Sequence, residues 1–363
     1  MSASGSTKQI LIAPLDWGLG HATRSIPVIR TCIEAGCSVV IASSGRSLAL
    51  LKNEFPDIRC IDLPSYNIYY QKKGSFVFTI IRQLGKVFSA IRREHRAVKK
   101  IISEHNIGLI ISDNRYGVYY ENIYSIIITH QLMVKLPGLK LIEKIVFLWL
   151  QWQHRKFNEV WIPDVAGKIN ISGDLSHKYK IGKQIKFIGV LTRFQKPSAL
   201  PPKQYDVIVI LSGPEPQRSI FEELIISQAQ KTNLKYLIVQ GISEVKSDEN
   251  KTPDIRVVSH LTGNDLFQAV LVSDIVISRG GYSTLMDLAP IGKRCIFVPT
   301  PGQTEQEYLV KELAGKQMVY YAEQEKFNLF EALEGVKKIN PFFIDVNCNE
   351  YKSYVLEAIN KLK

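Results

Sequence analysis

The sequence predicts an α/β protein of two Rossmann-like domains with parallel sheets, and three observations lead to this prediction. Short apolar runs alternate with longer helical patterns along most of the 363 residues, as expected when strands alternate with crossover helices. Two apolar runs lead through glycine turns into helices, at Gly18-Leu19-Gly20 and at Gly280-Gly281. A stretch containing three prolines, 194–204, separates the two series and is typical of an interdomain linker.

The first domain is expected over residues 1–195. Its helices are expected from about His21, over 47–55, and over a long pattern from about Phe76 to Ser103. The first glycine loop lacks the full spacing of a dinucleotide fingerprint, and no acidic residue ends the second strand, so we exclude a dinucleotide site. The expected strands are 9–13, 39–42, 58–62, 107–112, 126–129, 159–162 and 186–188.

The second domain is expected over residues 205–345. Its helices are predicted from about Arg218, over 265–272, from about Ser283 and after Gln303. The expected strands are 206–211, 236–239, 255–258, 274–278 and 295–298.

The turn at Gly280-Gly281 predicts an anion site. Glycines let a ligand approach the backbone, and a helix that begins near Ser283 and Thr284 offers unpaired N–H groups. These features suit a diphosphate, and the carboxylate of Asp287, about one turn further on, suits the two hydroxyls of a ribose. The same pattern also occurs as a simple tight turn, so it is weak evidence alone.

A second polar cluster follows the next strand, 295–298, and contains Gln303, Glu305 and Gln306. In an open parallel sheet, neighbouring strand ends face one crevice, so both clusters are expected to line one pocket.

These residues resemble a known family. Arg279-Gly280-Gly281 through Asp287, then 297–299 and 305–308, look like the donor-binding region of glycosyltransferase family 28. That family includes the transferase that adds N-acetylglucosamine to the lipid-linked peptidoglycan precursor, and it is related in fold to the UDP-glucuronosyltransferases. The resemblance implies the GT-B arrangement, in which two Rossmann-like domains face a central cleft. It also implies that a C-terminal helix, 350–363, packs back on the first domain.

Weaker matches lie elsewhere in the chain. Gly18-Leu19-Gly20-His21 followed by Arg24 resembles the first glycine loop of the family, and Arg193 matches an arginine placed near the donor diphosphate. Where the family has a Gly-Gly-Ser-type loop, Pro214 and Pro216 remove two N–H donors. The donor-binding residues implied are Gly18, Gly20, Arg193, Ser212, Gly213, Arg218, His260, Leu261, Arg279, Gly280, Gly281, Ser283, Thr284, Asp287, Gln303, Glu305 and Gln306.

Inverting transfer of a sugar needs a base for the acceptor hydroxyl and charge stabilisation for the departing diphosphate. We prefer His21 as the base, because it lies at a strand end and its ordinary pKa suits neutral pH. Asp113 and Asp16 are rivals, and His130 is a candidate for contact with the acceptor only. Alternatively, His21 only forms a hydrogen bond within its own loop. The sequence has no Asp-x-Asp motif and no histidine cluster, so we predict no metal and no cofactor besides the nucleotide-sugar co-substrate.

Charge is unevenly distributed. Residues 1–200 hold 28 Lys and Arg against 13 Asp and Glu, a balance of +15, whereas the remainder has a balance of −3. A basic first half indicates an anionic partner. Basic and aromatic residues in 76–103 and 139–156 suit helices at a membrane surface. A core helix with a solvated basic face explains 76–103 equally well, and buried packing is the simpler explanation of 139–156. Five scattered cysteines and no signal peptide or membrane span favour a cytoplasmic protein, and the basic first half favours a peripheral position on the inner face of the membrane.

The leading functional hypothesis is a metal-independent, inverting hexosyl- or N-acetylhexosaminyltransferase of cell envelope polysaccharide or glycolipid synthesis. It would use a UDP-linked sugar, and one option for the acceptor is a lipid-linked molecule at the inner face of the membrane. The first glycine loop also resembles the UDP-sugar hydrolases of nonulosonic acid synthesis, and non-hydrolysing epimerases are a weaker relative. A non-catalytic nucleotide-sugar- or nucleic-acid-binding protein is the remaining alternative. No helix-turn-helix, RRM or KH pattern is present, so no nucleic acid is expected.

Overall fold

The chain divides into two compact units, an N-terminal unit of residues 1–192 with 346–363 and a C-terminal unit of residues 193–345. The computed structural model describes residues 8–66, 76–136, 138–179, 182–194, 199, 201–242, 249–261 and 263–362, with the backbone alone for 76–84 and 249–250. Much of the expected linker, 195–198 and 200, and residues 67–75 lie outside the described residues.

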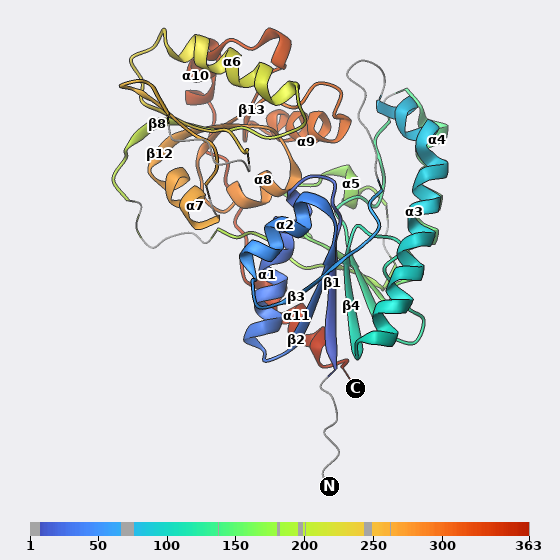
Figure 1. Ribbon diagram of the computed structural model, residues 1–363. Coiled ribbons are helices and arrows are strands. Elements are labelled where there is room, and N and C mark those ends of the chain that lie inside the picture. Colours follow the sequence, from blue (N-terminus) through green and yellow to red (C-terminus); the bar gives the residue numbers. More distant parts are fainter. Residues whose placement is uncertain are drawn as a thin grey trace. The chain divides into compact units, whose positions relative to one another are not determined.

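The N-terminal unit is built on a parallel sheet that has seven strands in its described residues, in the order β3-β2-β1-β4-β5-β6-β7. Strand addition reverses direction between β1 and β4, so the loops after these two strands lie at the switch point where open α/β sheets bind ligands (Figure 1). The register pairs Pro14 with Asp113 at the carboxyl ends of the two strands. The strands are β1 (Gln9–Pro14), β2 (Ser38–Ser43), β3 (Arg59–Asp62), β4 (Ile107–Asp113), β5 (Tyr124–Ile128), β6 (Glu159–Ile162) and β7 (Ile185–Phe187).

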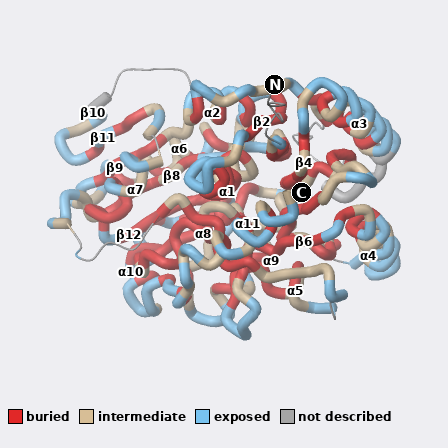
Figure 2. The backbone as a smooth tube through the Cα atoms, turned by 90° about the horizontal axis from the view of Figure 1, so that it is seen from below, coloured by how far each residue is buried: buried red, intermediate tan, exposed pale blue. Residues whose placement is uncertain are grey.

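Helices cover both faces of this sheet, which explains why its central strands are continuous apolar runs. In Figure 2 the strands β2, β4 and β6 are mostly buried, whereas the outer faces of α3 and α4 are exposed. The last helix, α11, packs on α1, so the C-terminal segment completes the N-terminal unit. The helices are α1 (Gly20–Glu34), α2 (Gly45–Glu54), α3 (Phe76–Glu104), α4 (Lys140–His154), α5 (Asp174–His177) and α11 (Glu350–Ile359).

The C-terminal unit repeats this plan, with the strand order β10-β11-β9-β8-β12-β13-β14 in its described residues. All neighbours pair in parallel except β10 and β11, which are antiparallel. The switch point lies between β8 and β12, which end next to the Ser212 loop and the Gly280-Gly281 turn. The strands are β8 (Tyr205–Ile210), β9 (Tyr236–Val239), β10 (Glu249–Thr252), β11 (Ile255–Val258), β12 (Ser273–Ser278), β13 (Arg294–Phe297) and β14 (Tyr320–Tyr321).

The helices of the C-terminal unit follow the predicted order, with one addition late in the chain. Helix α10 was not predicted, although Asn328 caps it by accepting hydrogen bonds from the backbone N–H groups of Phe330 (3.0 Å) and Glu331 (3.3 Å). The helices are α6 (Gln217–Ala229), α7 (Gly263–Leu271), α8 (Tyr282–Leu288), α9 (Thr304–Gly315), the 3-10 turn η1 (Gln324–Lys326) and α10 (Leu329–Lys337).

Candidate active site

The loop between β1 and α1 is fixed to the end of β4. The Leu15 N–H donates to the Asp113 carbonyl (3.0 Å), and the Ser47 hydroxyl donates to the Gly18 carbonyl (3.1 Å). Gly18 has φ of +79°, a conformation that favours glycine, so the turn depends on this residue. The loop delivers His21 into the first turn of α1, beside the carboxyl end of β4.

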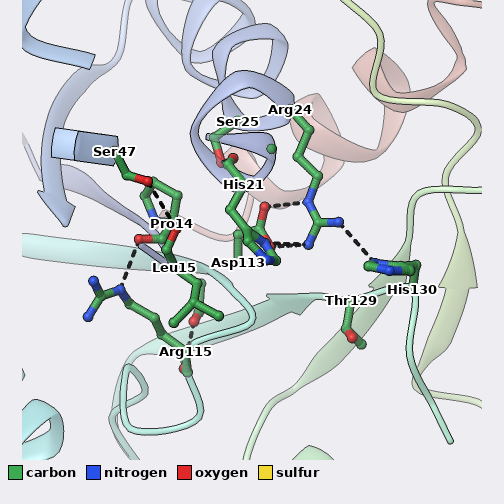
Figure 3. Close-up of polar contacts among 12 residues, drawn as sticks. Pro14, Leu15, His21, Arg24, Ser25, Ser47, Asp113, Arg115, Thr129 and His130 are labelled. Carbon is green, nitrogen blue, oxygen red and sulfur yellow. Dashed lines mark hydrogen bonds and ion pairs between the residues drawn. The ribbon is translucent and has the colours of Figure 1, made fainter. Parts of the chain in front are cut away.

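His21 and Asp113 form a pair at the switch point of the N-terminal unit. His21 Nδ1 lies 2.9 Å from Asp113 Oδ1, and the carboxylate is almost wholly buried, with 1% of its surface exposed. Arg24 follows His21 by three residues, on the same face of α1. Its Nε donates to Asp113 Oδ2 at 2.6 Å, and its Nη2 donates to Oδ1 (Figure 3).

The charges around this pair favour an ionised Asp113 and a neutral His21. Burial alone would raise the pKa of Asp113, but Arg24 and His21 hold that pKa well below its usual range. Burial and the charge of Arg24 lower the pKa of His21 and outweigh the opposing effect of Asp113. At neutral pH the imidazole of His21 is therefore uncharged and can accept a proton.

His130 joins the same cluster from the loop after β5. Its Nδ1 lies 3.0 Å from Arg24 Nη1, and the residue is 4% exposed. The Ser176 hydroxyl donates to the His130 carbonyl at 2.6 Å, which fixes the backbone there. The structure thus brings together three of the histidine and aspartate candidates through Arg24, a residue that the sequence analysis noted only as part of a motif.

Asp16 belongs to a separate buried network. Its Oδ2 accepts hydrogen bonds from Ser44 (2.7 Å) and Ser65 (2.6 Å). The fully buried Arg115 lies 3.7 Å from Asp16 Oδ1 and donates to Glu94 Oε1 at 2.7 Å. These contacts give Asp16 a role in holding the loop after β1, whereas its rivals His21 and Asp113 face each other.

In the C-terminal unit, the Gly280-Gly281 turn has a packing explanation. A Cβ atom on Gly280 would lie 2.0 Å from Val310 Cγ2, so α9 occupies the space that we expected to admit a ligand. A Cβ atom on Gly281 would meet only Thr284 Oγ1, at 4.0 Å, so the backbone is open there. Ser283 and Thr284 are half-buried in the first turn of α8.

Arg279 connects the loops at this sheet edge and is 1% exposed. Its Nη1 donates to the Val298 carbonyl (3.0 Å), and its Nη2 donates to the Gln217 carbonyl (2.8 Å) and to Gln324 Oε1 (2.7 Å). The guanidinium also lies over the Phe221 ring. Arg279 therefore organises the donor region from within, and its contacts do not support direct contact with a diphosphate.

Arg218 is engaged with acidic side chains of its own helix and loop. It pairs with Glu215 (2.5 Å) and Glu222 (2.7 Å), which neutralise its charge. Ser212 and Gly213, in the loop after β8, are exposed and remain available to a ligand.

Arg193 and Asp287 contact each other. Arg193 Nη2 donates to Asp287 Oδ2 at 2.9 Å, and the Arg193 N–H donates to Oδ1 at 3.2 Å. Arg193 was expected to contact the diphosphate and Asp287 the ribose. Either role would require the contact between the two side chains to break or to be shared with the ligand. His260 is exposed and Leu261 half-buried, both in the loop after β11.

The cluster before α9 closes its own turn. Gln306 Oε1 accepts the Thr300 N–H at 2.9 Å, and Gln306 Nε2 donates to Gln303 Oε1 at 3.3 Å. Glu305 is half-buried in the first turn of α9.

Among the described residues, no three His, Cys, Asp or Glu side chains are grouped as metal ligands. The metal-free reaction stays a prediction. No helix in the described part of the chain is both long and apolar enough to span a bilayer.

Comparison with known proteins agrees with this picture. Residues 207–342 match the glycosyltransferase family 28 C-terminal domain. An uncharacterised glycosyltransferase of Methanosarcina mazei is 22% identical over 317 residues, which cover 82% of this chain and 81% of that protein. UDP-N-acetylglucosamine--N-acetylmuramyl-(pentapeptide) pyrophosphoryl-undecaprenol N-acetylglucosamine transferase of Sulfurihydrogenibium is 28% identical over 159 residues, covering 41% of this chain and 44% of that protein. The crystal structure of Acinetobacter baumannii MurG matches with a TM-score of 0.55 and 15% identity, covering 97% of this chain and 99% of MurG.

The two parallel-sheet units have the GT-B glycosyltransferase fold, as predicted. The C-terminal unit contains a glycosyltransferase family 28 C-terminal domain, and the whole chain is distantly similar to MurG. The protein is therefore a nucleotide-sugar-dependent glycosyltransferase with the GT-B fold and a family 28 C-terminal domain.

Proposed function

We propose that the protein transfers a hexose or N-acetylhexosamine from a UDP-linked donor to an acceptor hydroxyl with inversion, and that His21 is the base. The observation that carries this proposal is the His21–Asp113 pair, 2.9 Å apart, at the switch point of the N-terminal unit. An uncharged imidazole beside an ionised carboxylate is the arrangement that general base catalysis requires. Asp113 is then the partner that orients His21, and it does not compete for the proton.

The proposed step is a single displacement. His21 Nε2 takes the proton of the acceptor hydroxyl, and the acceptor oxygen forms a bond to the anomeric carbon. The bond between that carbon and the diphosphate oxygen breaks, and the nucleoside diphosphate leaves with the electron pair. The attack occurs on the face opposite the leaving group, so the configuration inverts. Asp113 stabilises the imidazolium that forms, as the carboxylate does in a catalytic triad.

The donor is assigned to the C-terminal unit because that unit contains the family 28 domain. The exposed Ser212 and Gly213 are the candidates for diphosphate contact, together with Arg193 once it releases Asp287. A UDP-linked sugar is proposed because the Sulfurihydrogenibium relative is named for one.

The acceptor is proposed to be amphiphilic, and the surface of α4 supports this. The four residues Leu141, Ile145, Leu148 and Trp152 recur at helical spacing and are between 55% and 73% exposed. Lys156 Nζ lies 3.9 Å from the centre of the Trp152 ring. A stripe of exposed apolar side chains next to cations is the chemistry of a helix that docks at an anionic lipid surface. We call these four residues the α4 stripe.

Aromatic side chains connect the β1–α1 loop with α4. The rings of Trp17 and Tyr66 lie 5.8 Å apart, and those of Tyr116 and Trp149 lie 5.6 Å apart. Tyr66, Tyr116 and Trp149 pack around one apolar cluster, and Phe88 of α3 contacts Trp149 at 5.8 Å. These rings pack in series between the loop that carries His21 and α4, and Trp17 and Phe88 are exposed along this series. It suits an acceptor whose apolar part stays at a lipid surface while its hydroxyl reaches His21.

Donor turnover with and without acceptor tests the proposal. Purified full-length protein is incubated with UDP-, dTDP- and GDP-linked hexoses and N-acetylhexosamines, with and without a polyprenyl-linked sugar, and release of nucleoside diphosphate is followed. We expect acceptor-dependent release with a UDP-sugar, and a decrease of about 10²–10⁴-fold in kcat for His21→Gln. His105→Gln is the matched control outside the cluster.

Two outcomes would contradict the proposal. Unchanged turnover in His21→Gln would remove His21 as the base. Release of free sugar at a rate independent of any acceptor would identify a nucleotide-sugar hydrolase instead.

A further inference from the structure

A single guanidinium, that of Arg24, contacts three ionisable side chains at the switch point of the N-terminal unit. Its Nε lies 2.6 Å from Asp113 Oδ2, its Nη1 3.0 Å from His130 Nδ1, and its Nη2 2.9 Å from His21 Nδ1. Arg24 is 2% exposed and Asp113 1%. Because the five N–H donors of arginine form a rigid planar fork, one side chain fixes the mutual spacing of its three partners.

The contact with Arg24 determines the tautomer of His130. An arginine donates hydrogen bonds and cannot accept them, and it stays protonated in proteins. His130 Nδ1 must therefore accept from Nη1 and carry no proton. A neutral His130 then bears its proton on Nε2, so this histidine presents an N–H donor on the opposite side of the ring from Arg24.

Two neighbours lie within hydrogen-bond distance of His21 Nδ1, at the same distance. Arg24 Nη2 and Asp113 Oδ1 both lie 2.9 Å from it, and one is a donor while the other is an acceptor. Arg24 Nη2 also donates to Asp113 Oδ1, so one of its N–H groups is already used. Its second N–H could donate to an unprotonated Nδ1, or Nδ1–H of His21 could donate to Asp113, and both distances fit either arrangement. The second arrangement leaves the Nε2 lone pair to act as a base, and it is the one that the proposed function of His21 needs.

We propose that Arg24 is the positioning residue of the transfer reaction: it holds Asp113, keeps His21 as a neutral Nδ1–H tautomer, and holds His130 as a neutral Nε2–H tautomer. The inference rests on the proposed function of His21, and Arg24 acts only through its three partners. The positive charge of Arg24 opposes formation of the His21 imidazolium, so it also sets the pH below which the base is lost. The charged and titratable groups around His21 are Arg24 on α1, Asp113 at the end of β4 and His130 after β5.

Two substitutions separate the charge of Arg24 from its geometry. Arg24→Lys keeps the charge but cannot reach three partners with one fork, whereas Arg24→Gln removes the charge. We expect both variants to lose at least about tenfold in kcat, with little change in KM for the donor. In Arg24→Gln the acidic limb of the kcat profile should move up by about one pH unit, because His21 loses a repelling charge. In Arg24→Lys the limb should stay near its wild-type position.

The deciding measurement needs no substrate. The full-length protein is labelled with 15N-histidine, its seven histidines are followed by NMR between pH 4 and 8, and His21→Gln and His130→Gln assign the two signals. We expect His130 to be the Nε2–H tautomer and His21 the Nδ1–H tautomer at neutral pH. The titration midpoint of His21 should rise in Arg24→Gln.

A proton on His130 Nδ1, or a His21 midpoint that Arg24→Gln leaves unchanged, would overturn the inference. If Arg24→Gln does not fold, the wild-type tautomers and Arg24→Lys decide the question. If the spectra are as expected but the protein transfers no sugar, the proposed function is wrong and the hydrogen-bond arrangement around Arg24 is still supported.

Discussion

At the scale of single residues, the neighbours of a titratable group determine what it can do. Asp113 and Asp16 are both carboxylates near strand ends, but they have different partners. Arg24 and His21 form hydrogen bonds with Asp113, whereas Ser44 and Ser65 donate to Asp16. Burial without partners has a different result at His154. This residue is 0% exposed, neither ring nitrogen has a hydrogen-bond partner among the residues that the structure describes, and burial lowers its pKa to about 4.

His154 is predicted to make the N-terminal unit sensitive to acid. In the unfolded chain the pKa of histidine is about 6.5, so below that pH the unfolded state binds the proton that the folded state rejects. The free energy of unfolding should therefore fall as the pH drops from about 6.5 towards 4. When the pH is lowered from 7 to 5, the free energy of unfolding of His154→Phe should fall by about 2 kcal/mol less than that of the wild type.

Urea unfolding followed by tryptophan fluorescence measures this difference, because all four tryptophans lie in the N-terminal unit. His105→Phe, at the C-terminal end of α3, controls for the loss of one imidazole. Equal pH dependence in wild type and His154→Phe would show that His154 gains partners in solution.

Residue chemistry was predictable from the sequence only where it is local. His21 was chosen as the candidate base from its place after a glycine loop at a strand end, and this role stays a prediction. Its partner Asp113 lies 92 residues away, so only the sheet topology shows that the two meet. Arg279 was expected to contact the donor. The sequence motif does not show that its side chain is buried, and in the structure its guanidinium hydrogen-bonds to the backbone of two loops.

At the scale of elements, helix α4 is predicted to hold the protein at anionic lipid. Ile145 and Leu148 are 59% and 58% exposed within the α4 stripe, and Lys140 and Lys144 are exposed on the same helix. Burying each apolar side chain in the interface contributes on the order of 1 kcal/mol or more, and each cation near the surface adds about 1 kcal/mol. Ile145→Ser with Leu148→Ser should therefore weaken vesicle binding by at least about tenfold.

Co-sedimentation with phosphatidylcholine vesicles, with and without phosphatidylglycerol, measures this binding. The wild type should bind the anionic vesicles, and less strongly at high salt. Ile220→Ser with Phe330→Ser is the matched control, since both residues are 46% exposed on α6 and α10. Equal losses in the two double variants, or no binding by the wild type, would remove the membrane role of α4.

Strongly apolar elements were predicted well, and short polar ones were not. The central strands are runs of Ile, Leu and Val that are buried on both faces, and their predicted bounds agree with the structure within one or two residues. Strand β10 reads Glu-Asn-Lys-Thr and has no apolar signal, and β14 is only Tyr-Tyr, which is too short to show a strand pattern. The role of Gly280 was also missed, because its contact is with Val310 of α9, which is distant in sequence.

At the scale of the whole molecule, the alternation of strands and helices indicated two Rossmann-like domains, and the motif in 279–308 identified the second as the donor domain. The fold prediction is confirmed by the two sheet orders and the family resemblance by the family 28 match over 207–342, whereas the donor role of the second unit stays a prediction. The contact between Arg193 and Asp287 could not be predicted from the sequence. The two residues are 94 positions apart, and only the fold shows that they meet.

This division into two units predicts where a donor will act. A ligand that binds only the folded C-terminal unit should stabilise that unit, by about 2.7 kcal/mol when it is present at 100 times its Kd. In a domain of this size that corresponds to a rise of about 5–10 °C in Tm. Calorimetry with UDP, dTDP, GDP, CMP and ADP should show the rise with UDP, in the transition that tryptophan fluorescence does not follow. Arg193→Gln should reduce the shift and Lys326→Gln, on the exposed turn η1, should not. A shift with another nucleotide would change the donor class, and no shift with any of the five would contradict nucleotide binding by residues 193–345.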